Sequence, residues 1–319
     1  MIHKIGILTS GGDSPGMNAA IRSVTRSALY AGIEVVGIYD GYKGLVEGKF
    51  EEFNHNSVSD IVGRGGTILG SARLPDFDKE ELQLKAVEKL NEANIDGLVV
   101  IGGDGTYRGG LALYQRGIKT IALPGTIDND IQGTDFTIGF DTALNTIVEC
   151  VDKLKDTSSS HHRCSVVEVM GNHCGDLAIY SGISCGAEVV ITPESGFDEQ
   201  AALEKLYYLE SHGKNHAIVI VSEKILDVEK FAQKISETVG FAGRATILGH
   251  IQRGGSPTPT DRVLASRMGA KAVELLMNNQ GGLCVGIHNN EIVTMSIEEC
   301  INTPRPSRKE FYRLLEKIV

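Results

Sequence analysis

Residues 4–39 read KIGILTSGGDSPGMNAAIRSVTRSALYAGIEVVGIY and contain a complete unit of strand, loop, helix and strand. Lys4–Leu8 is an apolar run of strand length, and the glycine-rich loop Ser10–Gly16 follows it. Met17–Ala31 repeats an apolar residue every third or fourth position, which predicts an amphipathic helix, and Glu34–Tyr39 predicts the next strand. The glycines let the chain turn sharply between the first strand and its helix.

The same alternation continues to about residue 277. Repeated strand–helix pairs are typical of an α/β protein whose parallel sheets are covered by helices. One helix is expected to begin near Asp141 or Thr142, since both are residue types that cap helices. No repeat or long linker marks a domain boundary, and we place the boundaries in loops near residues 139 and 250. The remaining predicted strands are Gly97–Ile101, Thr120–Leu123, Ser165–Val169, Ala187–Ile191, Ala217–Val221 and Ala245–Leu248, and the remaining helices are Glu80–Ala93, His173–Ser184, Gln200–Ser211, Val228–Thr238 and Thr260–Met277.

Composition limits the classes of protein that the chain can represent. Its 319 residues suffice for roughly two domains. With 31 basic and 41 acidic residues the net charge is −10, which disfavours nonspecific nucleic-acid binding. No run approaches the ~18 apolar residues of a membrane span, and the first residues lead straight into a strand, so we expect neither a membrane protein nor a signal peptide. Six cysteines without a Cys-x-x-Cys pair predict free thiols in a reducing cytoplasm.

Three unusual loops follow predicted strands, where parallel sheets place their ligands. In Gly11–Gly16, glycines let backbone N–H groups approach a phosphate at a helix start, although a plain tight turn has the same composition. In Gly102–Thr106, a carboxylate between glycines suits either Mg²⁺ held on phosphates or a helix cap. In Pro124–Asp130, Asp128 and Asp130 alternate and so face one side of an extended segment. One carboxylate there can accept a proton while the other orients a metal, and an Asx-rich turn is the alternative.

Cationic side chains mark other loops. Gly249–Gly255 places His250 and Arg253 beside glycines after a strand, which suits an anionic group of a ligand. His161–Arg163 and Arg244 are further candidates for anion binding, although each by itself fits a solvated surface charge better.

Taken together, LTSGGD (8–13), GGDG (102–105), PGTIDND (124–130) and GHIQRGG (249–255) closely resemble the loops of the bacterial ATP-dependent 6-phosphofructokinases. The resemblance runs from residue 1 to about 290 and includes the chain length. It implies an α/β fold of two similar domains, each a mostly parallel sheet covered by helices on both faces. It implies a larger nucleotide-binding domain, 1–138 with 251–303, and a smaller sugar-phosphate-binding domain, 139–250 with 304–319.

The resemblance further implies a glycolytic kinase that moves the γ-phosphoryl group of ATP, with Mg²⁺, to the 1-hydroxyl of fructose 6-phosphate. Asp128 would take the proton of the attacking hydroxyl, Thr126 would contact the moving phosphoryl group, and Arg73 would reach phosphate oxygens. Asp104 and Asp130 would serve the metal. The nucleotide positions are Gly12, Tyr42, Arg73, Leu74, Gly103, Asp104, Gly105 and Thr106. The sugar-phosphate positions are Thr126, Ile127, Asp128, Arg163, Met170, Gly171, Asn172, Glu223, Arg244, His250, Ile251, Gln252 and Arg253.

A homotetramer is also implied, in which Arg163 and Arg244 reach the active site of a neighbouring subunit. Family members carry an effector site for ADP and phosphoenolpyruvate between subunits. Arg22 and Arg26 lie four residues apart and share a helix face, which without the resemblance fits a solvated surface. The other effector positions are His55, Lys155, Gly186, Glu188, His212 and Lys214.

At three positions the chain departs from the commoner family pattern. Asn172 stands where many members carry Arg and brings no charge to phosphate oxygens, so we expect weaker transition-state stabilisation or altered coupling, not loss of activity. His55 and His212 stand where Arg and Lys are common, so we expect effector binding to be weaker at pH 8 and to strengthen toward pH 6.

Two alternative functions stay open at this point. A pyrophosphate-dependent phosphofructokinase typically carries Asp at the position of Gly105 and Lys at that of Gly125, and both glycines are expected to leave room for a nucleotide, which favours ATP. A non-catalytic sugar-phosphate-binding regulator on the same fold is the second alternative. The three carboxylates Asp104, Asp128 and Asp130 argue against it, because binding of anions gains nothing from added negative charge.

Overall fold

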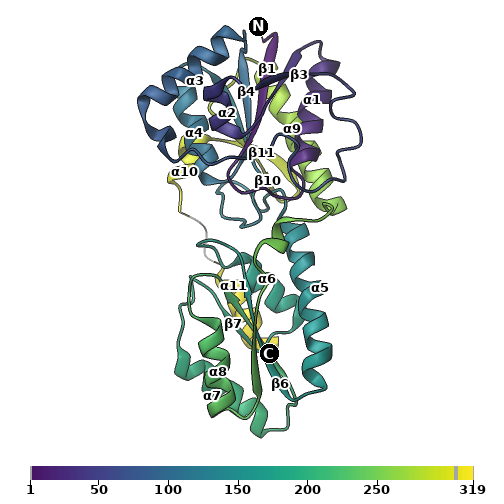
Figure 1. Cartoon of the computed structure of the whole chain (residues 1–319), viewed down its shortest axis with the longest axis vertical. Helices are drawn as coiled ribbons and strands as arrows, with labels where there is room; N and C mark the ends of the chain where they lie inside the picture. Colours follow the sequence, from purple (N-terminus) through teal and green to yellow (C-terminus); the bar gives the residue numbers. More distant parts are fainter. Residues whose placement is uncertain (1, 305–307, 319) are drawn as a thin grey trace. The chain divides into compact units, whose positions relative to one another are not determined.

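A computed structural model describes residues 2–304 and 308–318 of the chain and divides into two units (Figure 1). The first unit holds the described residues of 1–127, 131–142 and 253–305, and the second holds those of 128–130, 143–252 and 306–319. The chain therefore crosses between the units at residues 127/128, 130/131, 142/143 and 252/253, whereas we placed residues 128–130 in the larger domain. The assignment of one ligand to each unit stays a prediction.

The first unit is built on a seven-stranded sheet in the order β11-β10-β5-β4-β1-β2-β3. Its central pairs are parallel, and only the outer pairs, β2 with β3 and β10 with β11, are antiparallel. The antiparallel outer strands extend the sheet without a crossover helix. The strands are β1 (Lys4–Ser10), β2 (Glu34–Ile38), β3 (Phe50–Phe53), β4 (Gly97–Gly102), β5 (Lys119–Pro124), β10 (Leu283–His288) and β11 (Glu291–Ser296).

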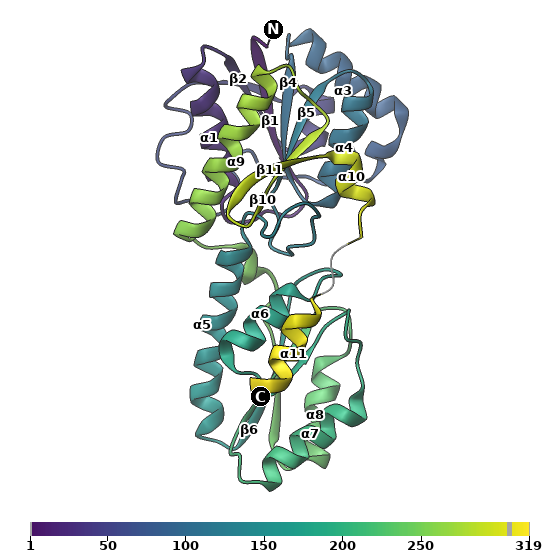
Figure 2. The ribbon, with the colours of Figure 1, turned by 180° about the vertical axis from the view of Figure 1, so that it is seen from behind.

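Helices cover both faces of this sheet. Alternate side chains of β1 point to opposite faces, so that Ile5 and Ile7 join the core under α1 (Met17–Tyr30) and α9 (Pro259–Met277), which lie side by side in Figure 2. Leu8 joins the core on the other face. That face is covered by α2 (Gly41–Glu47), α3 (Glu80–Glu92), α4 (Asp104–Gln115) and α10 (Ile297–Asn302), with the short 3₁₀ helix η1 (Pro75–Asp78) beside them.

The second unit is built on a four-stranded sheet in the order β7-β8-β6-β9, in which every pair is parallel. Its core packs β6, β7 and β8 against α7 and α8. The strands are β6 (Arg163–Val169), β7 (Val189–Ile191), β8 (Ala217–Ser222) and β9 (Ala242–Ile247). The helices are α5 (Phe140–Ser159), which begins in the first unit, α6 (Asp176–Cys185), α7 (Glu199–Ser211), α8 (Val228–Thr238) and α11 (Lys309–Ile318), and the 3₁₀ helix η2 (Gly249–Arg253) follows β9.

The α/β fold and its mostly parallel sheets confirm the prediction, and the long elements lie close to their predicted limits. Across the described ranges, no helix has the length and apolarity that a bilayer crossing requires. The six cysteines all lie in the described ranges, and no disulfide joins any of them. The prediction that Asp141 or Thr142 caps α5 was wrong, because the helix already begins at Phe140.

The start of α5 is instead held by Asp261 of α9. Its buried carboxylate accepts hydrogen bonds from the Gly139 and Thr142 backbone N–H groups at 2.9 and 2.8 Å, and from Thr142 Oγ1 at 2.6 Å. In return, Thr258, which caps α9, donates from its backbone N–H to Thr142 Oγ1 at 3.0 Å and from its hydroxyl to Asp141 at 2.6 Å. The two helix starts therefore satisfy each other's orphan N–H groups. Burial raises the pKa of Asp261 to about 6 despite these donors.

Candidate functional site

Three of the predicted loops meet at the carboxyl end of the first sheet. Ser10 of β1 pairs with Gly102 of β4, and Gly102 pairs with Pro124 of β5, so the residues that follow these strands are neighbours. The absence of a side chain at Gly102 is required here, because a Cβ atom would lie 2.4 Å from the Ser10 carbonyl oxygen. The structure thus brings together in one place the loops that follow β1, β4 and β5.

Tyr42 and Thr106 support the second loop from inside. The Tyr42 hydroxyl donates to the Thr106 carbonyl at 2.6 Å, and the Thr106 hydroxyl donates to the Ser10 carbonyl at 3.1 Å. Both side chains are buried, and a Cβ atom at Gly109 would lie 2.5 Å from the Tyr42 ring. Burial raises the pKa of Tyr42, so its hydroxyl stays a hydrogen-bond donor. These predicted nucleotide residues therefore hold the start of α4 in place.

Asp104 is the exposed first residue of α4, and Gly103 is the helix cap. The Asp104 carboxylate is paired with Arg108, with Nε to Oδ2 at 2.9 Å and Nη2 to Oδ1 at 3.3 Å. At Gly105, the next residue, a Cβ atom would meet no atom within 4 Å. The loop is therefore open at Gly105, which lies at the positive end of α4 and next in sequence to an exposed carboxylate.

The first loop lies against a cation. A Cβ atom at Gly12 would lie 3.1 Å from Cζ of Arg253, which belongs to the same unit. We predicted Arg253 to bind the sugar phosphate, but in this structure its guanidinium lies against the glycine loop. The Ser71 hydroxyl donates to the Gly11 carbonyl, which ties the loop to the segment that carries Arg73. Arg73 is exposed, and Leu74 packs partly into the core.

The third loop contains a correction. At Gly125 a Cβ atom would lie 2.8 Å from Cγ2 of Ile101 and 3.2 Å from Cε of Met17, so this glycine faces packed side chains. The expectation that Gly125 leaves room for a nucleotide was therefore wrong, whereas Gly105 does border open space. Thr126, the next residue, is buried, and Thr137 donates to its carbonyl at 2.6 Å.

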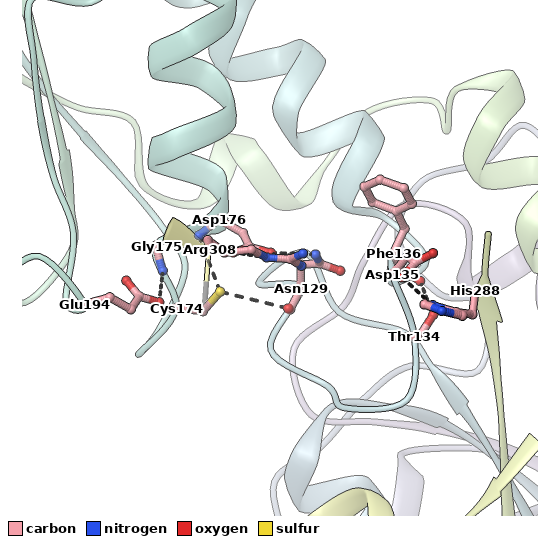
Figure 3. Close-up of polar contacts among 10 residues, drawn as sticks. All are labelled: Asn129, Thr134, Asp135, Phe136, Cys174, Gly175, Asp176, Glu194, His288 and Arg308. Atoms are coloured by element: carbon pink, nitrogen blue, oxygen red, sulfur yellow. Dashed lines mark hydrogen bonds and ion pairs between the residues drawn. The ribbon is translucent and has the colours of Figure 1, made fainter. Parts of the chain in front are cut away.

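Asp128, Asn129 and Asp130 belong to the second unit, and Figure 3 shows Asn129 with its polar contacts. Asn129 is buried and has a φ of 52°, in the left-handed region that Asn tolerates better than most residues. Its side-chain amide donates to Asp176 at 2.8 Å. Asp176 in turn accepts from Arg308. No local sequence pattern predicts this network, since its members are spread over residues 129–308.

A second cluster of predicted residues stands at the carboxyl end of β6. The Met170 backbone N–H donates to Gln252 Oε1 at 3.1 Å, and the Asn172 backbone N–H donates to Glu223 Oε1 at 2.9 Å. Gly171 has a φ of 142°, which allows the turn between them. Lys224, which sequence reasoning did not single out, donates to Asn172 Oδ1 at 2.8 Å, so the position without an arginine still has a cation beside it.

Arg163 and Arg244 do not belong to that cluster. Arg163 is the first residue of β6, and Arg244 pairs in register near it, opposite Ser165. Met170 follows the other end of the same strand, and a strand rises by roughly 3.3 Å per residue, so the whole length of β6 separates Met170 from Arg163. These two arginines therefore lie near the amino end of the sheet, and the rest of the sugar group lies at its carboxyl end. His250 and Ile251 are exposed in η2.

The predicted effector residues are divided between the two units. In the first unit, Arg26 Nη2 donates to the His55 carbonyl at 3.2 Å. In the second, Lys155 donates to the Cys185 carbonyl at 2.7 Å, beside Gly186 with its φ of 62°. Glu188 is buried, accepts from the Ile218 backbone N–H at 2.6 Å and pairs with Lys214. Arg22 is half-buried on α1, and His212 is exposed at the end of α7.

Within residues 2–304 and 308–318, no three His, Cys, Asp or Glu side chains gather as the ligands of a metal ion. Mg²⁺ commonly takes only one or two protein carboxylates and fills its other positions with water and substrate phosphates. The exposed Asp104 carboxylate at the open glycine loop has the hard oxygen donors that suit this ion. To bind the metal, Asp104 would have to give up its ion pair with Arg108.

The family described as Phosphofructokinase matches residues 4–276. A protein named ATP-dependent 6-phosphofructokinase from Tolumonas auensis is 57% identical over 315 residues, or 98% of each chain. One of the same name from Vibrio cholerae is 54% identical over 319 residues, or 100% of each chain. Because that alignment reaches the last residue, the limit near residue 290 that we set for the resemblance was too short.

Solved structures agree with the fold. The phosphofructokinase from Saccharomyces cerevisiae is 34% identical and superposes with a TM-score of 0.86 over 99% of this chain, which spans 46% of the yeast chain. A pyrophosphate-dependent phosphofructokinase from Marinobacter aquaeolei superposes with a TM-score of 0.87 over 98% of this chain and 91% of that chain. At 19% identity, that second likeness concerns the fold alone.

Proposed function

Because this chain belongs to the phosphofructokinase family, we propose that it transfers the γ-phosphoryl group of ATP to the 1-hydroxyl of fructose 6-phosphate. The products are fructose 1,6-bisphosphate and ADP, and the reaction is a step of glycolysis. The observation that carries the proposal is the likeness, over essentially the whole chain, to relatives named ATP-dependent 6-phosphofructokinases. With this function we expect a cytoplasmic protein.

The nucleotide binds, in this proposal, at the carboxyl end of the first sheet. Gly12 and Gly103 let backbone N–H groups reach the phosphates, and the positive end of α4 favours their charge. Arg73 contacts phosphate oxygens from its exposed position, and Leu74 lines the site. Asp104, with support from Asp130, would hold Mg²⁺, and the ion would neutralise charge on the phosphates.

Asp128 acts as the general base and takes the proton of the sugar's 1-hydroxyl. Thr126 contacts the moving phosphoryl group. In a loose transition state the hydroxyl proton leaves late, so a carboxylate of ordinary basicity suffices and its placement matters most. The placement of Asp128 depends on the rigid turn at Asn129, which is buried and hydrogen-bonded.

The sugar phosphate binds at the carboxyl end of β6, with Met170, Gly171 and Glu223 at the sugar and His250 at an anionic group. Arg253, which lies against the glycine loop of the first unit, is assigned to a further anionic group of the substrate by the family resemblance. Arg163 and Arg244 lie toward the amino end of that sheet, which fits a role in the site of a neighbouring subunit and supports a homotetramer. The net charge of −10 makes such a local cluster of cations necessary for a sugar phosphate.

We assign ADP and phosphoenolpyruvate to a site between subunits formed by Arg22, Arg26 and His55 from one unit and by Lys155, Gly186, Glu188, His212 and Lys214 from the other. Two contacts support this assignment. Arg26 contacts the His55 carbonyl in the first half of the site, and Lys214 pairs with Glu188 in the second half. The departures at His55 and His212 are proposed to weaken effector binding, and Asn172 to alter coupling or transition-state stabilisation.

A pyrophosphate-dependent reaction is the second candidate, and a single feature separates it from the first. Gly105 borders open space and bears no carboxylate that would repel a nucleotide. The regulator alternative is disfavoured by Asp104, whose exposed negative charge would weaken simple anion binding unless a metal is also present.

The test compares ATP and pyrophosphate as donors for the purified chain with fructose 6-phosphate and Mg²⁺. We expect turnover with ATP, measured as ADP release, and a loss of kcat of at least ~10²-fold in Asp128→Asn with little change in KM for ATP. Turnover with pyrophosphate alone would refute the ATP assignment. Binding of fructose 6-phosphate without turnover by either donor would establish the regulator.

A further inference from the structure

The loop that carries the proposed base is connected to the last helix of the chain. Within the second unit, Asn129 donates its side-chain amide to Asp176 Oδ2 at 2.8 Å. Arg308 donates to the same carboxylate, from Nη2 to Oδ2 at 3.0 Å and from Nε to Oδ1 at 3.4 Å. Figure 3 shows the three side chains gathered together, with the contacts that Asp176 makes drawn as dashed lines.

Asp176 is suited to act as a fixed anchor. It is the first residue of α6, where a negative charge is favourable, and its side chain is 1% exposed. A buried carboxylate is stable only when cations and donors satisfy it, and here Arg308 supplies the cation. Cys174 adds a second tie, since its thiol accepts from the Asp176 backbone N–H at 3.4 Å and lies 3.9 Å from the Asn129 carbonyl.

Arg308 is itself held by the helix that it precedes. Its carbonyl accepts from the Phe311 backbone N–H at 2.9 Å, which starts α11. The Phe311 ring packs at a tilt against Tyr180 of α6 with ring centroids 4.9 Å apart, and the Tyr312 and Thr192 hydroxyls are hydrogen-bonded to each other. The last helix therefore docks on the same α6 whose first residue contacts Asn129.

We propose that Arg308 and Asp176 are positioning residues for the Asp128–Asp130 loop, so that docking of α11 sets the geometry of the base. This inference rests on the proposed function of Asp128. Asn129 has no freedom to relax independently, because its left-handed backbone and its buried amide are both fixed. A displacement of about 1 Å in such a loop can cost ~10²-fold in rate, which makes the anchor relevant to turnover.

The experiment measures kcat, the KM for ATP and the KM for fructose 6-phosphate in the full-length protein. Arg308→Gln should lower kcat at least ~10-fold, expressed per site that binds fructose 6-phosphate by calorimetry, with the KM for ATP within about two-fold of the original. Counting competent sites removes the contribution of misfolded protein. Arg308→Lys keeps the cation and should recover a substantial part of kcat.

Arg313→Gln is the matched control, since Arg313 is exposed on the same helix and the variant makes the same change of charge. It should leave kcat unchanged. Asp176→Asn combined with Arg308→Gln removes the buried charge together with its partner, and provides a folded variant if the single change unfolds the protein. The proposal is overturned if folded Arg308→Gln or the double variant keeps kcat per competent site within about two-fold. A wild-type chain that transfers no phosphoryl group would instead refute the proposed function, and the inference with it.

Discussion

A carboxylate at position 105 should discriminate against ATP without harming the fold. A Cβ atom there meets nothing within 4 Å, so the side chain of Gly105→Asp has space and displaces no neighbour. Position 105 is in the first turn of α4, where Asp gains about 0.3–1 kcal/mol from the helix dipole, offset in part by the neighbouring Asp104. The free energy of unfolding should therefore change by less than about 1 kcal/mol.

The effect on nucleotide binding is larger. A carboxylate about 6 Å from one phosphate charge is repelled by about 2.8 kcal/mol at an effective dielectric constant of 20, which corresponds to about a 100-fold higher KM for ATP. The assay is initial-rate kinetics over a range of MgATP concentrations at saturating fructose 6-phosphate, together with chemical denaturation of the same samples.

Gly105→Ala is the matched control, because it adds the same Cβ atom without charge. It should stabilise α4 by up to about 1 kcal/mol and change the KM for ATP less than about three-fold. If Gly105→Asp leaves the KM for ATP unchanged, the nucleotide phosphates do not approach this loop. If the alanine variant raises the KM as much as the aspartate variant, the effect is steric, and the electrostatic argument fails.

Three further outcomes are expected. Gly125→Ala places a Cβ atom 2.8 Å from Ile101 Cγ2 and should cost about 1–3 kcal/mol of stability in chemical denaturation; an unchanged midpoint would contradict the packing argument. Because burial raises the pKa of Asp261 from 3.8 to about 6, the folded chain binds a proton that the unfolded chain releases, and this contribution to stability is lost as the pH rises through 6. The wild type should therefore lose about 1.4 kcal/mol more than Asp261→Asn between pH 5 and 7.5, and parallel pH curves would exclude the effect. Arg26→Ala removes the contact with the His55 carbonyl and should weaken activation by ADP without changing kcat at saturating fructose 6-phosphate, and undiminished activation would remove Arg26 from the effector site.

Periodicity predicted the central elements because both faces of the sheets are buried. β4 is buried at every position, and its continuous apolar run identifies a strand covered on both sides. The edge strands β3 and β11 were missed because they lack this burial on both faces, and β10 (Leu283–His288) was missed although four of its six residues are buried. β3 reads FEEF, with exposed glutamates at its centre, and β11 is partly exposed along most of its length, so neither has a clear apolar pattern. α2 contains two glycines in seven residues and gives little helical signal.

The candidate site was predictable where it consists of loops with unusual composition. The loops that follow β1, β4 and β5 carry glycine and aspartate patterns that local sequence reveals, and the sheet register then places them together. The Asp176–Arg308 pair is different, because its two residues are remote in sequence and each has an ordinary local context. Likewise, no local pattern shows that Asp261 rather than Asp141 holds the start of α5. Such contacts arise from tertiary packing and have no periodic signal.

The discontinuous make-up of the first unit has a consequence for biosynthesis. β5 is paired on one side with β4, and its other side pairs with β10, where Ile121 meets Leu283. During translation at 5–20 residues per second, β5 therefore remains a sheet edge for roughly 8 to 30 s, while the residues of the second unit emerge. An unpaired central strand is open to pairing with other nascent chains. Folding of the first unit can be completed only after residues 143–252 of the second unit, and then β10, have left the ribosome.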